Sequence, residues 1–286
     1  MGKAAGFIKL LRPINGLMMG VAVLVGASLA LMRPFSIDVA VSLLLGFITA
    51  FTLTGASMAI NDYYDYEIDK INEPNRPIPS GAVKRGECMV FALILIITGL
   101  AASILIAPFS LMPFLVAVVS LFTSLLYATK GKKTGLTGNF LVSACVAIPF
   151  VYGSFVVGQS LSLRVLFFSV LAFLANTGRE VTKGIVDFEG DKIKGIKTIM
   201  AVYGSKKASI VAAFFFLSAV ILSLLPWFLG IVSTWYLPPV IVTDLGFTIS
   251  STMLVKDHSK EKARQIKNLV LVWMLLGMIS FFTGTL

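Results

Sequence analysis

The chain has 286 residues, of which 57% are hydrophobic and only 13% are charged, and its formal net charge is +10. A soluble domain carries about twice that charged fraction. His258 is the only histidine, which excludes a histidine-based catalytic triad and a multi-histidine metal or haem site. The two cysteines, Cys88 and Cys145, lie too far apart for a zinc motif or a disulfide framework.

Repeated apolar windows predict an all-α, polytopic membrane protein. The mean hydropathy is +0.92, and each window of about 20 residues is long enough to cross a bilayer core. We expect a single domain over residues 1–286, built as a bundle of about nine transmembrane helices. The expected helices span residues 14–32, 38–61, 88–107, 111–129, 137–157, 163–186, 208–229, 236–255 and 268–285. The first is expected to stay in the protein as a membrane helix, because no signal-peptide cleavage site follows it.

The basic residues predict the orientation of these helices. The N-terminus and the segments around 62–87, 130–136, 187–207 and 256–267 hold 22 of the 24 Lys and Arg residues, and only Arg33 and Arg164 fall on the other side. By the positive-inside rule, the N-terminus and these four loops are expected in the cytoplasm and the C-terminus outside. This asymmetry also explains the pI of about 9.6, so no nucleic-acid partner is needed, and no protein partner is inferred.

An acidic stretch follows the second apolar window. No charge occurs from Val39 to Ile60, whereas Asp62, Asp65 and Asp69 then follow at spacings of three and four. On a helix these carboxylates share one face, where like charges repel one another unless a cation lies among them. The stretch therefore predicts a cation site.

A second acidic stretch follows the sixth apolar window. Asp187 and Asp191 are four residues apart, and Arg179 and Lys183 precede them at the same interval, so the four lie along one slowly drifting helical face. Both stretches lead into a loop with basic residues and a glycine, as an internal duplication would produce. One such cluster is often only a solvated helix end, but two with matched spacing favour a site.

The ligand types in these stretches indicate the metal. Carboxylates without thiolate or imidazole partners suit hard cations such as Mg²⁺. In proteins Mg²⁺ prefers one or two carboxylates together with phosphate oxygens and water. The two stretches therefore predict carboxylates that bridge through Mg²⁺ to a diphosphate, with Lys and Arg neutralising the remaining charge.

A basic loop, three tyrosines and one aspartate within a predicted span are further candidates for parts of a site. The basic loop 130–135 resembles a phosphate loop, but Leu126 stands where that motif needs glycine and a helix precedes it, so a nucleotide fold is rejected. The loop remains a candidate anion site. Tyr63, Tyr64 and Tyr66 are expected to anchor at the membrane interface. Asp244, an ionisable residue within a predicted span, is either functional or a structural partner of a polar neighbour.

The two acidic stretches carry a resemblance to a known family. Asn61-Asp62-x-x-Asp65-x-x-x-Asp69 resembles the first aspartate-rich motif of the UbiA-type intramembrane prenyltransferases, and Asp187-x-x-x-Asp191 resembles the second. The turn at residues 76–81 and Tyr127 with its basic loop extend the resemblance over most of the chain. In that family the motifs bind Mg²⁺ and the diphosphate of a polyprenyl donor, and the acceptor is prenylated in a chamber open sideways to lipid.

Within the family, residues 176–187 are most similar to the archaeal digeranylgeranylglyceryl phosphate synthases. This resemblance implies transfer of a geranylgeranyl group from geranylgeranyl diphosphate to geranylgeranylglyceryl phosphate, in archaeal ether-lipid synthesis. An aromatic prenyltransferase for quinone or chlorophyll precursors is the alternative within the family. A divalent-cation transporter and a non-catalytic lipid-binding scaffold are the alternatives outside it; carboxylates at helix ends count against a transporter, whose site lies near the membrane midplane.

The expected site follows from the motifs and the resemblance together. Asp65, Asp69, Asp187 and Asp191 are expected to be catalytic. The expected Mg²⁺ ligands are Asn61, Asp62, Asp65, Asp69, Asp187 and Asp191. The expected substrate-binding residues are Asn61, Arg76, Tyr127, Lys130, Lys132, Lys133, Arg179 and Lys183.

Overall fold

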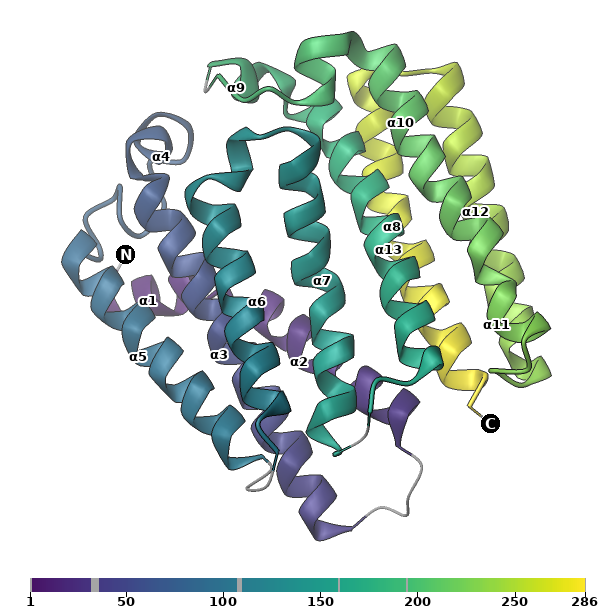
Figure 1. Cartoon of the computed structure of the whole chain (residues 1–286). Coiled ribbons are helices and arrows are strands. Elements are labelled where there is room, and N and C mark those ends of the chain that lie inside the picture. Colours follow the sequence, from purple (N-terminus) through teal and green to yellow (C-terminus); the bar gives the residue numbers. More distant parts are fainter. Residues whose placement is uncertain (1, 32–35, 107–109, 159, 194, 286) are drawn as a thin grey trace. The chain divides into compact units, whose positions relative to one another are not determined.

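The computed structural model describes residues 2–31, 36–106, 110–158, 160–193 and 195–285 (Figure 1). Throughout these ranges the regular structure is helical, which confirms the all-α prediction. Among them are nine helical stretches long and apolar enough to cross a membrane. The predicted number of spans is therefore confirmed for the described part of the chain.

The helices are grouped into two compact units, and the first comprises Met1–Thr129 and Ile148–Leu161. Its elements are α1 (Lys3–Leu11), α2 (Pro13–Ala30), α3 (Ile37–Tyr64), α4 (Tyr66–Asn72), α5 (Arg85–Leu105), α6 (Met112–Thr129) and the end of α7 (Leu136–Val156). The central helix is α3, which packs against α1, α2, α5 and α6. A buried cluster that includes Leu10, Ile60, Ile78 and Val83 packs the acidic end of α3 against α1 and the loop before α5.

Two glycines allow a close helix contact inside this unit. A Cβ atom on Gly26 of α2 would collide with the backbone carbonyl of Phe150, and one on Gly153 of α7 would collide with that of Val23. Small residues let helix backbones approach closely in a membrane, where van der Waals packing rather than hydrophobicity drives helix association. The end of α7 is thereby fixed on α2.

The second unit comprises Lys130–Ala147 and Ser162–Leu286. Besides the start of α7 it contains η1 (Gly131–Lys133), α8 (Leu163–Val186), α9 (Phe188–Ile193), α10 (Ile199–Ser223), α11 (Leu225–Phe228), η2 (Thr234–Tyr236), α12 (Leu237–Lys256) and α13 (Lys260–Thr283). Four long helices form a closed ring, in which α8 and α12 each pack against both α10 and α13 (Figure 1). Phe216, Phe247, Leu254 and Ile266 lie in the core of that ring.

The structure differs from the sequence prediction at several helix starts. Helix α10 begins at Ile199, nine residues before the predicted start at 208, and Gly204 interrupts it with a left-handed φ of 81°. Helix α13 begins at Lys260 rather than at 268, because the Ser259 hydroxyl caps it by accepting the Lys262 N–H at 3.3 Å. The charged first turn of α13 is not marked by periodicity in apolar residues, and in α10 the glycine and the Lys206-Lys207 pair separate the apolar first turn from the predicted span.

Candidate active site at two acidic helix ends

Asp65 lies at the junction between α3 and α4. Its backbone N–H donates to the carbonyl of Asn61 at 2.9 Å and closes α3, while its own carbonyl accepts the N–H of Asp69 at 2.8 Å and opens α4. The chain therefore stays nearly helical through the acidic stretch. The predicted three- and four-residue spacing is thus realised as a helix end followed by a short helix.

Two arginines lie among the carboxylates of this stretch. Asp62 is only 3% exposed, and its Oδ1 accepts from Arg12 Nη2 at 2.6 Å and from Arg76 Nη1 at 3.4 Å. The same Arg76 nitrogen donates to Asp69 Oδ2 at 2.6 Å. Buried carboxylates are tolerated only when paired, so the two guanidinium groups compensate the charge of Asp62 and Asp69. The cation that the sequence requires among these acids is supplied, in part, by the protein.

Burial and charge act in opposite directions on Arg76. Burial lowers the pKa of its guanidinium, but the carboxylates of Asp62 and Asp69 outweigh burial and hold the pKa above its ordinary value. Arg76 therefore stays cationic at every physiological pH. Since one of its nitrogens spans both carboxylates, Arg76 fixes the end of α3 relative to α4.

Sequence reasoning missed Arg12. This residue joins α1 to α2 with φ 47° and ψ 65°, and no other non-glycine residue in the described ranges has a positive φ. A left-handed conformation costs an L-residue roughly 1–2 kcal/mol, which the short ion pair with Asp62 offsets. The partners are 50 residues apart. The only signal in the sequence is a basic residue directly before Pro13, and it does not identify Asp62 as the partner.

Asn61 orients the central aspartate of the stretch. Its Nδ2 donates to Asp65 Oδ2 at 2.9 Å, and both residues are half-buried. A carboxylate has about four acceptor positions, so this bond leaves capacity for a metal ligand bond on the same group.

The second acidic stretch repeats this local geometry in the other unit. Asp187 follows α8, where its N–H donates to the carbonyl of Lys183 at 3.0 Å, and its own carbonyl accepts the N–H of Asp191 at 3.0 Å. Asp187 is exposed and Asp191 is half-buried. Both units therefore carry the same sequence of a long helix, a capping aspartate and a short acidic helix, as an internal duplication would produce.

Glu180 separates the two basic residues of α8 and was not predicted as part of the site. Its Oε1 accepts from Arg179 Nη1 at 3.1 Å, and its Oε2 lies 3.6 Å from Lys183 Nζ. The Glu180 side chain is only 12% exposed. Arg179 Nε is buried without a hydrogen-bond partner in the described part of the chain. This guanidinium N–H is a donor suited to a phosphate oxygen.

A buried polar contact anchors this part of α8. Ser143 of α7 accepts hydrogen bonds from Asn176 Nδ2 at 3.2 Å and from Thr177 Oγ1 at 2.9 Å. Ser143 and Thr177 are fully buried. In an apolar bundle such bonds fix the rotation of one helix on another, and here they fix which way the basic face of α8 turns.

The basic loop forms a tight turn rather than a phosphate cradle. Residues Gly131–Lys133 make a single 3₁₀ turn, and Thr134 Oγ1 donates to the carbonyl of Gly131 at 2.7 Å. Lys130 and Lys133 are exposed, and the side chain of Lys132 lies outside the described part of the structure. Tyr127 lies in the last turn of α6 and is half-buried. The predicted anion-binding role of this loop stays a prediction.

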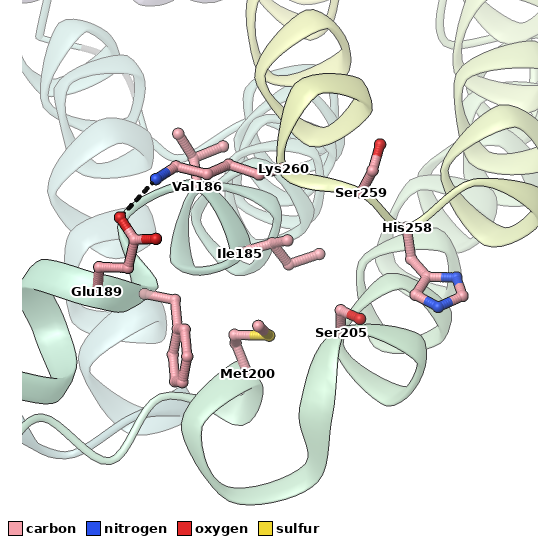
Figure 2. Close-up of a pocket in the computed structure, with 9 residues that line it drawn as sticks. Ile185, Val186, Glu189, Met200, Ser205, His258, Ser259 and Lys260 are labelled. Carbon is pink, nitrogen blue, oxygen red and sulfur yellow. Dashed lines mark hydrogen bonds and ion pairs between the residues drawn. The ribbon is translucent and has the colours of Figure 1, made fainter.

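A pocket of about 290 Å³ borders the second acidic stretch (Figure 2). Glu189 and Lys260 form an ion pair of 2.7 Å across it, while Ser205 and His258 line its other side. The hydrogen bond from Lys260 holds the pKa of the Glu189 carboxyl below its usual value. The pair connects α9 to the start of α13.

Asp244 belongs to a separate polar contact on α12. Its Oδ2 accepts from Ser223 Oγ at 2.7 Å, and Tyr236 Oη donates to the carbonyl of Ser223 at 2.7 Å. Asp244 therefore has a polar neighbour as a structural partner, one of the two roles expected from the sequence.

The donor set suits Mg²⁺ shared with a phosphate ligand. Over the described residues, no three His, Cys, Asp or Glu side chains converge as a metal cage. Mg²⁺ does not need one, because it binds through one or two carboxylates and completes its shell with phosphate oxygens and water. Each unit offers one aspartate that fits that role, Asp65 in the first and Asp187 in the second, and neither is fully buried. The unsatisfied Nε of Arg179 fits the phosphate.

Comparison with known proteins decides the family. The model of the UbiA prenyltransferase family matches residues 19–279. The chain belongs to this family. As a UbiA prenyltransferase it is an enzyme, which decides against the transporter and scaffold alternatives, and it is a multi-pass membrane protein.

Curated relatives extend over the whole length of this UbiA chain. A digeranylgeranylglyceryl phosphate synthase from Methanosphaera stadtmanae is 35% identical over 281 residues, which cover 98% of this chain and 99% of that protein. The protein of the same name from Pyrococcus furiosus is 36% identical, with 98% and 97% covered. The predicted resemblance to this group is confirmed.

Solved structures agree with the fold. A structure presented as a digeranylgeranylglyceryl phosphate synthase in membranes is 31% identical, with a TM-score of 0.85 and 99% of both chains covered. A UbiA homologue from Archaeoglobus fulgidus, bound to GPP and Mg²⁺, has a TM-score of 0.70 at 16% identity and covers 97% of this chain and 99% of its own. The second likeness supports the fold alone.

Proposed function

We propose that this UbiA prenyltransferase transfers a geranylgeranyl group from geranylgeranyl diphosphate to geranylgeranylglyceryl phosphate, and that Mg²⁺ is required. The product is digeranylgeranylglyceryl phosphate, a precursor of archaeal ether lipids. One observation carries the choice of acceptor: relatives that bear the name of this synthase match the chain from end to end at about 35% identity. The solved homologue with GPP and Mg²⁺ supports a prenyl diphosphate donor and a divalent metal.

The acidic helix ends are the proposed binding groups for the donor. Asp65 and Asp69 in one unit and Asp187 and Asp191 in the other hold the metal, with Asn61 orienting Asp65 as it does in the structure. When bound, Mg²⁺ supplies positive charge to the diphosphate oxygens. Asp62 is buried and paired with Arg12, and it remains a proposed metal ligand together with Asn61.

The basic residues are proposed to balance the leaving group. As the allylic C–O bond of the donor breaks, its electron pair stays on the diphosphate, and Arg179 and Lys183 stabilise that charge. The acceptor hydroxyl oxygen then forms the new C–O bond, and its proton passes to a carboxylate or to the diphosphate. Lys130, Lys132 and Lys133 are the proposed partners of the acceptor phosphate, and Arg76 and Tyr127 complete the substrate-binding set.

The apolar helices have a chemical role in this proposal. An allylic carbocation reacts with water, so the reacting carbon must be held where water is excluded. We infer a lipid-accessible chamber, a single functional domain made of both units, and acidic ends that face the cytoplasm with the C-terminus outside. The distribution of Lys and Arg supports that orientation.

The proposal is tested with purified protein, geranylgeranyl diphosphate and Mg²⁺, given either geranylgeranylglyceryl phosphate or an aromatic acceptor. Mass spectrometry is expected to find the diether phosphate with the first acceptor and no prenylated product with the second. Chelation of Mg²⁺ by EDTA is expected to stop the reaction. Prenylation of only the aromatic acceptor would overturn the proposed substrate while leaving the family assignment in place.

A further inference from the structure

Arg85 contacts both sides of the bend that carries the first acidic stretch. Its Cζ lies 4.4 Å from the ring centroid of Tyr63, in the last turn of α3, and 4.9 Å from that of Tyr66, the first residue of α4. These two tyrosines flank Asp65, the capping residue of the bend. A guanidinium group at this distance from an aromatic ring face is attracted by the ring quadrupole.

Arg85 differs from the other arginines near this stretch. Arg12 and Arg76 form ion pairs with carboxylates, whereas among the described residues no carboxylate pairs with Arg85. Both rings also pack against the buried cluster at the end of α3. Both rings therefore contact the core and the Arg85 guanidinium, and Lys70 Nζ also lies 4.2 Å from the Tyr66 ring centroid.

Two arginines around the loop between α4 and α5 contact the same bend, Arg76 within the loop and Arg85 as the first residue of α5. Backbone hydrogen bonds from Ser80 N–H to the Arg76 carbonyl at 3.0 Å and from Val83 N–H to the Pro77 carbonyl at 3.0 Å close this loop. Arg76 precedes the closed part and contacts Asp62 and Asp69. Arg85 follows it and contacts the tyrosines. The two arginines thus contact both the carboxylates and the tyrosine rings of the bend.

We propose that Arg85 is a positioning residue, which fixes the α3–α4 bend through Tyr63 and Tyr66 and thereby sets the direction of the Asp65 carboxylate toward a divalent metal. This inference rests on the proposed metal-binding role of the first acidic stretch. Asp65 caps α3 and opens α4, so a change in the angle between these helices turns its carboxylate. Arg85 itself contacts neither metal nor substrate.

The test measures metal affinity without lipid substrates. Mn²⁺ is titrated into the purified full chain, and free Mn²⁺ is followed by electron paramagnetic resonance. Loss of both exposed cation–π contacts is expected to change the affinity by at most roughly 5- to 30-fold. Arg85→Leu is expected to weaken Mn²⁺ binding within that range, and Arg85→Lys, which keeps a cation, is expected to recover part of the loss.

The ring contacts are tested from the other side. Tyr63→Phe keeps the ring face and is expected to bind Mn²⁺ like the wild type, whereas Tyr63→Leu is expected to bind it several-fold more weakly. This pair decides the matter even if Arg85→Leu fails to fold. Lys207→Leu is the matched control, because Lys207 Nζ lies 5.4 Å from the Tyr203 ring on α10, in the other unit; its Mn²⁺ affinity is expected to stay unchanged.

Each outcome separates this inference from the proposed function. Wild-type Mn²⁺ affinity in Arg85→Leu, or equal affinities of Tyr63→Phe and Tyr63→Leu, would overturn the positioning role alone. An equal loss in Lys207→Leu would also overturn it, since the effect would then not depend on the bend. If the wild type binds Mn²⁺ only when inorganic diphosphate is present, the variants are compared under that condition; a wild-type protein that binds no Mn²⁺ under either condition would instead overturn the proposed metal dependence.

Discussion

Replacing Arg76 with methionine tests how the first acidic stretch is held together. Arg76 Nη1 lies 2.6 Å from Asp69 Oδ2 and 3.4 Å from Asp62 Oδ1, and these aspartate side chains are only 6% and 4% exposed. Methionine keeps much of the length of the side chain but removes the charge. Asp62 retains Arg12 in this variant, so the main effect falls on Asp69.

The size of the effect follows from the burial of the pair. Breaking a buried ion pair from one side costs about 3–5 kcal/mol. The Arg76 side chain is 27% exposed, and solvent screening there reduces the expected loss to roughly 2 kcal/mol. For a chain of this size, that corresponds to a midpoint about 4–8 °C lower. Because a bound divalent cation would replace part of the lost positive charge, the loss is expected to be smaller with Mg²⁺ and a diphosphate present.

Thermal unfolding of the detergent-solubilised protein measures the change in midpoint caused by Arg76→Met, once in EDTA and once with Mg²⁺ and inorganic diphosphate. Arg164→Met is the matched control, since among the described residues Arg164 donates to the Ile231 carbonyl, at 3.1 and 3.2 Å, in the other unit. The loss of midpoint in this control relative to the wild type is expected to be the same in EDTA as with Mg²⁺ and diphosphate. A midpoint of Arg76→Met within about 1 °C of the wild type in EDTA would refute the argument.

Three further predictions address the metal, the packing and the charge of individual residues. Asp65→Asn and Asp187→Asn are each expected to lower turnover roughly 100-fold or more while unfolding midpoints stay near wild type, because neither carboxyl is fully buried; full turnover in either would contradict its assigned role. Gly26→Leu is expected to destabilise the protein by about 1–3 kcal/mol in chemical unfolding, since its side chain would meet the α7 backbone; an unchanged stability would count against that contact. The Glu189–Lys260 pair contributes stability above the ordinary glutamate pKa, and this is lost as pH falls through the lowered pKa of folded Glu189; Lys260→Met is expected to raise that pKa in a carboxyl NMR titration, and no change would contradict the pairing.

Much of the fold was predictable because bilayer length and apolar composition mark a membrane helix directly. The predicted span 163–186 and α8 (Leu163–Val186) agree at both ends. The short helices α4 and α9 were missed. Helices of 7 and 6 residues are too short to be stable alone, so their formation depends on the surrounding packing rather than on a sequence period.

The candidate site was predictable where its members are close in sequence. The spacing of Asp62, Asp65 and Asp69 required a nearby cation, and Arg76 lies within the same loop. Arg12 could not be assigned, since 50 residues separate it from Asp62 and only the folded chain brings them together. Glu180 was overlooked because it does not share the four-residue spacing of Arg179, Lys183, Asp187 and Asp191, and only the structure shows its contacts with Arg179 and Lys183.

The central claim is that this UbiA prenyltransferase extends a lipid phosphate. It is tested most directly by a competition assay that offers geranylgeranylglyceryl phosphate and an aromatic acceptor together, with geranylgeranyl diphosphate and Mg²⁺. We predict that mass spectrometry finds digeranylgeranylglyceryl phosphate as the prenylated product, and that Asp65→Asn and EDTA each abolish it. Prenylation of the aromatic acceptor in preference, or a diether product that persists in EDTA, would contradict the account.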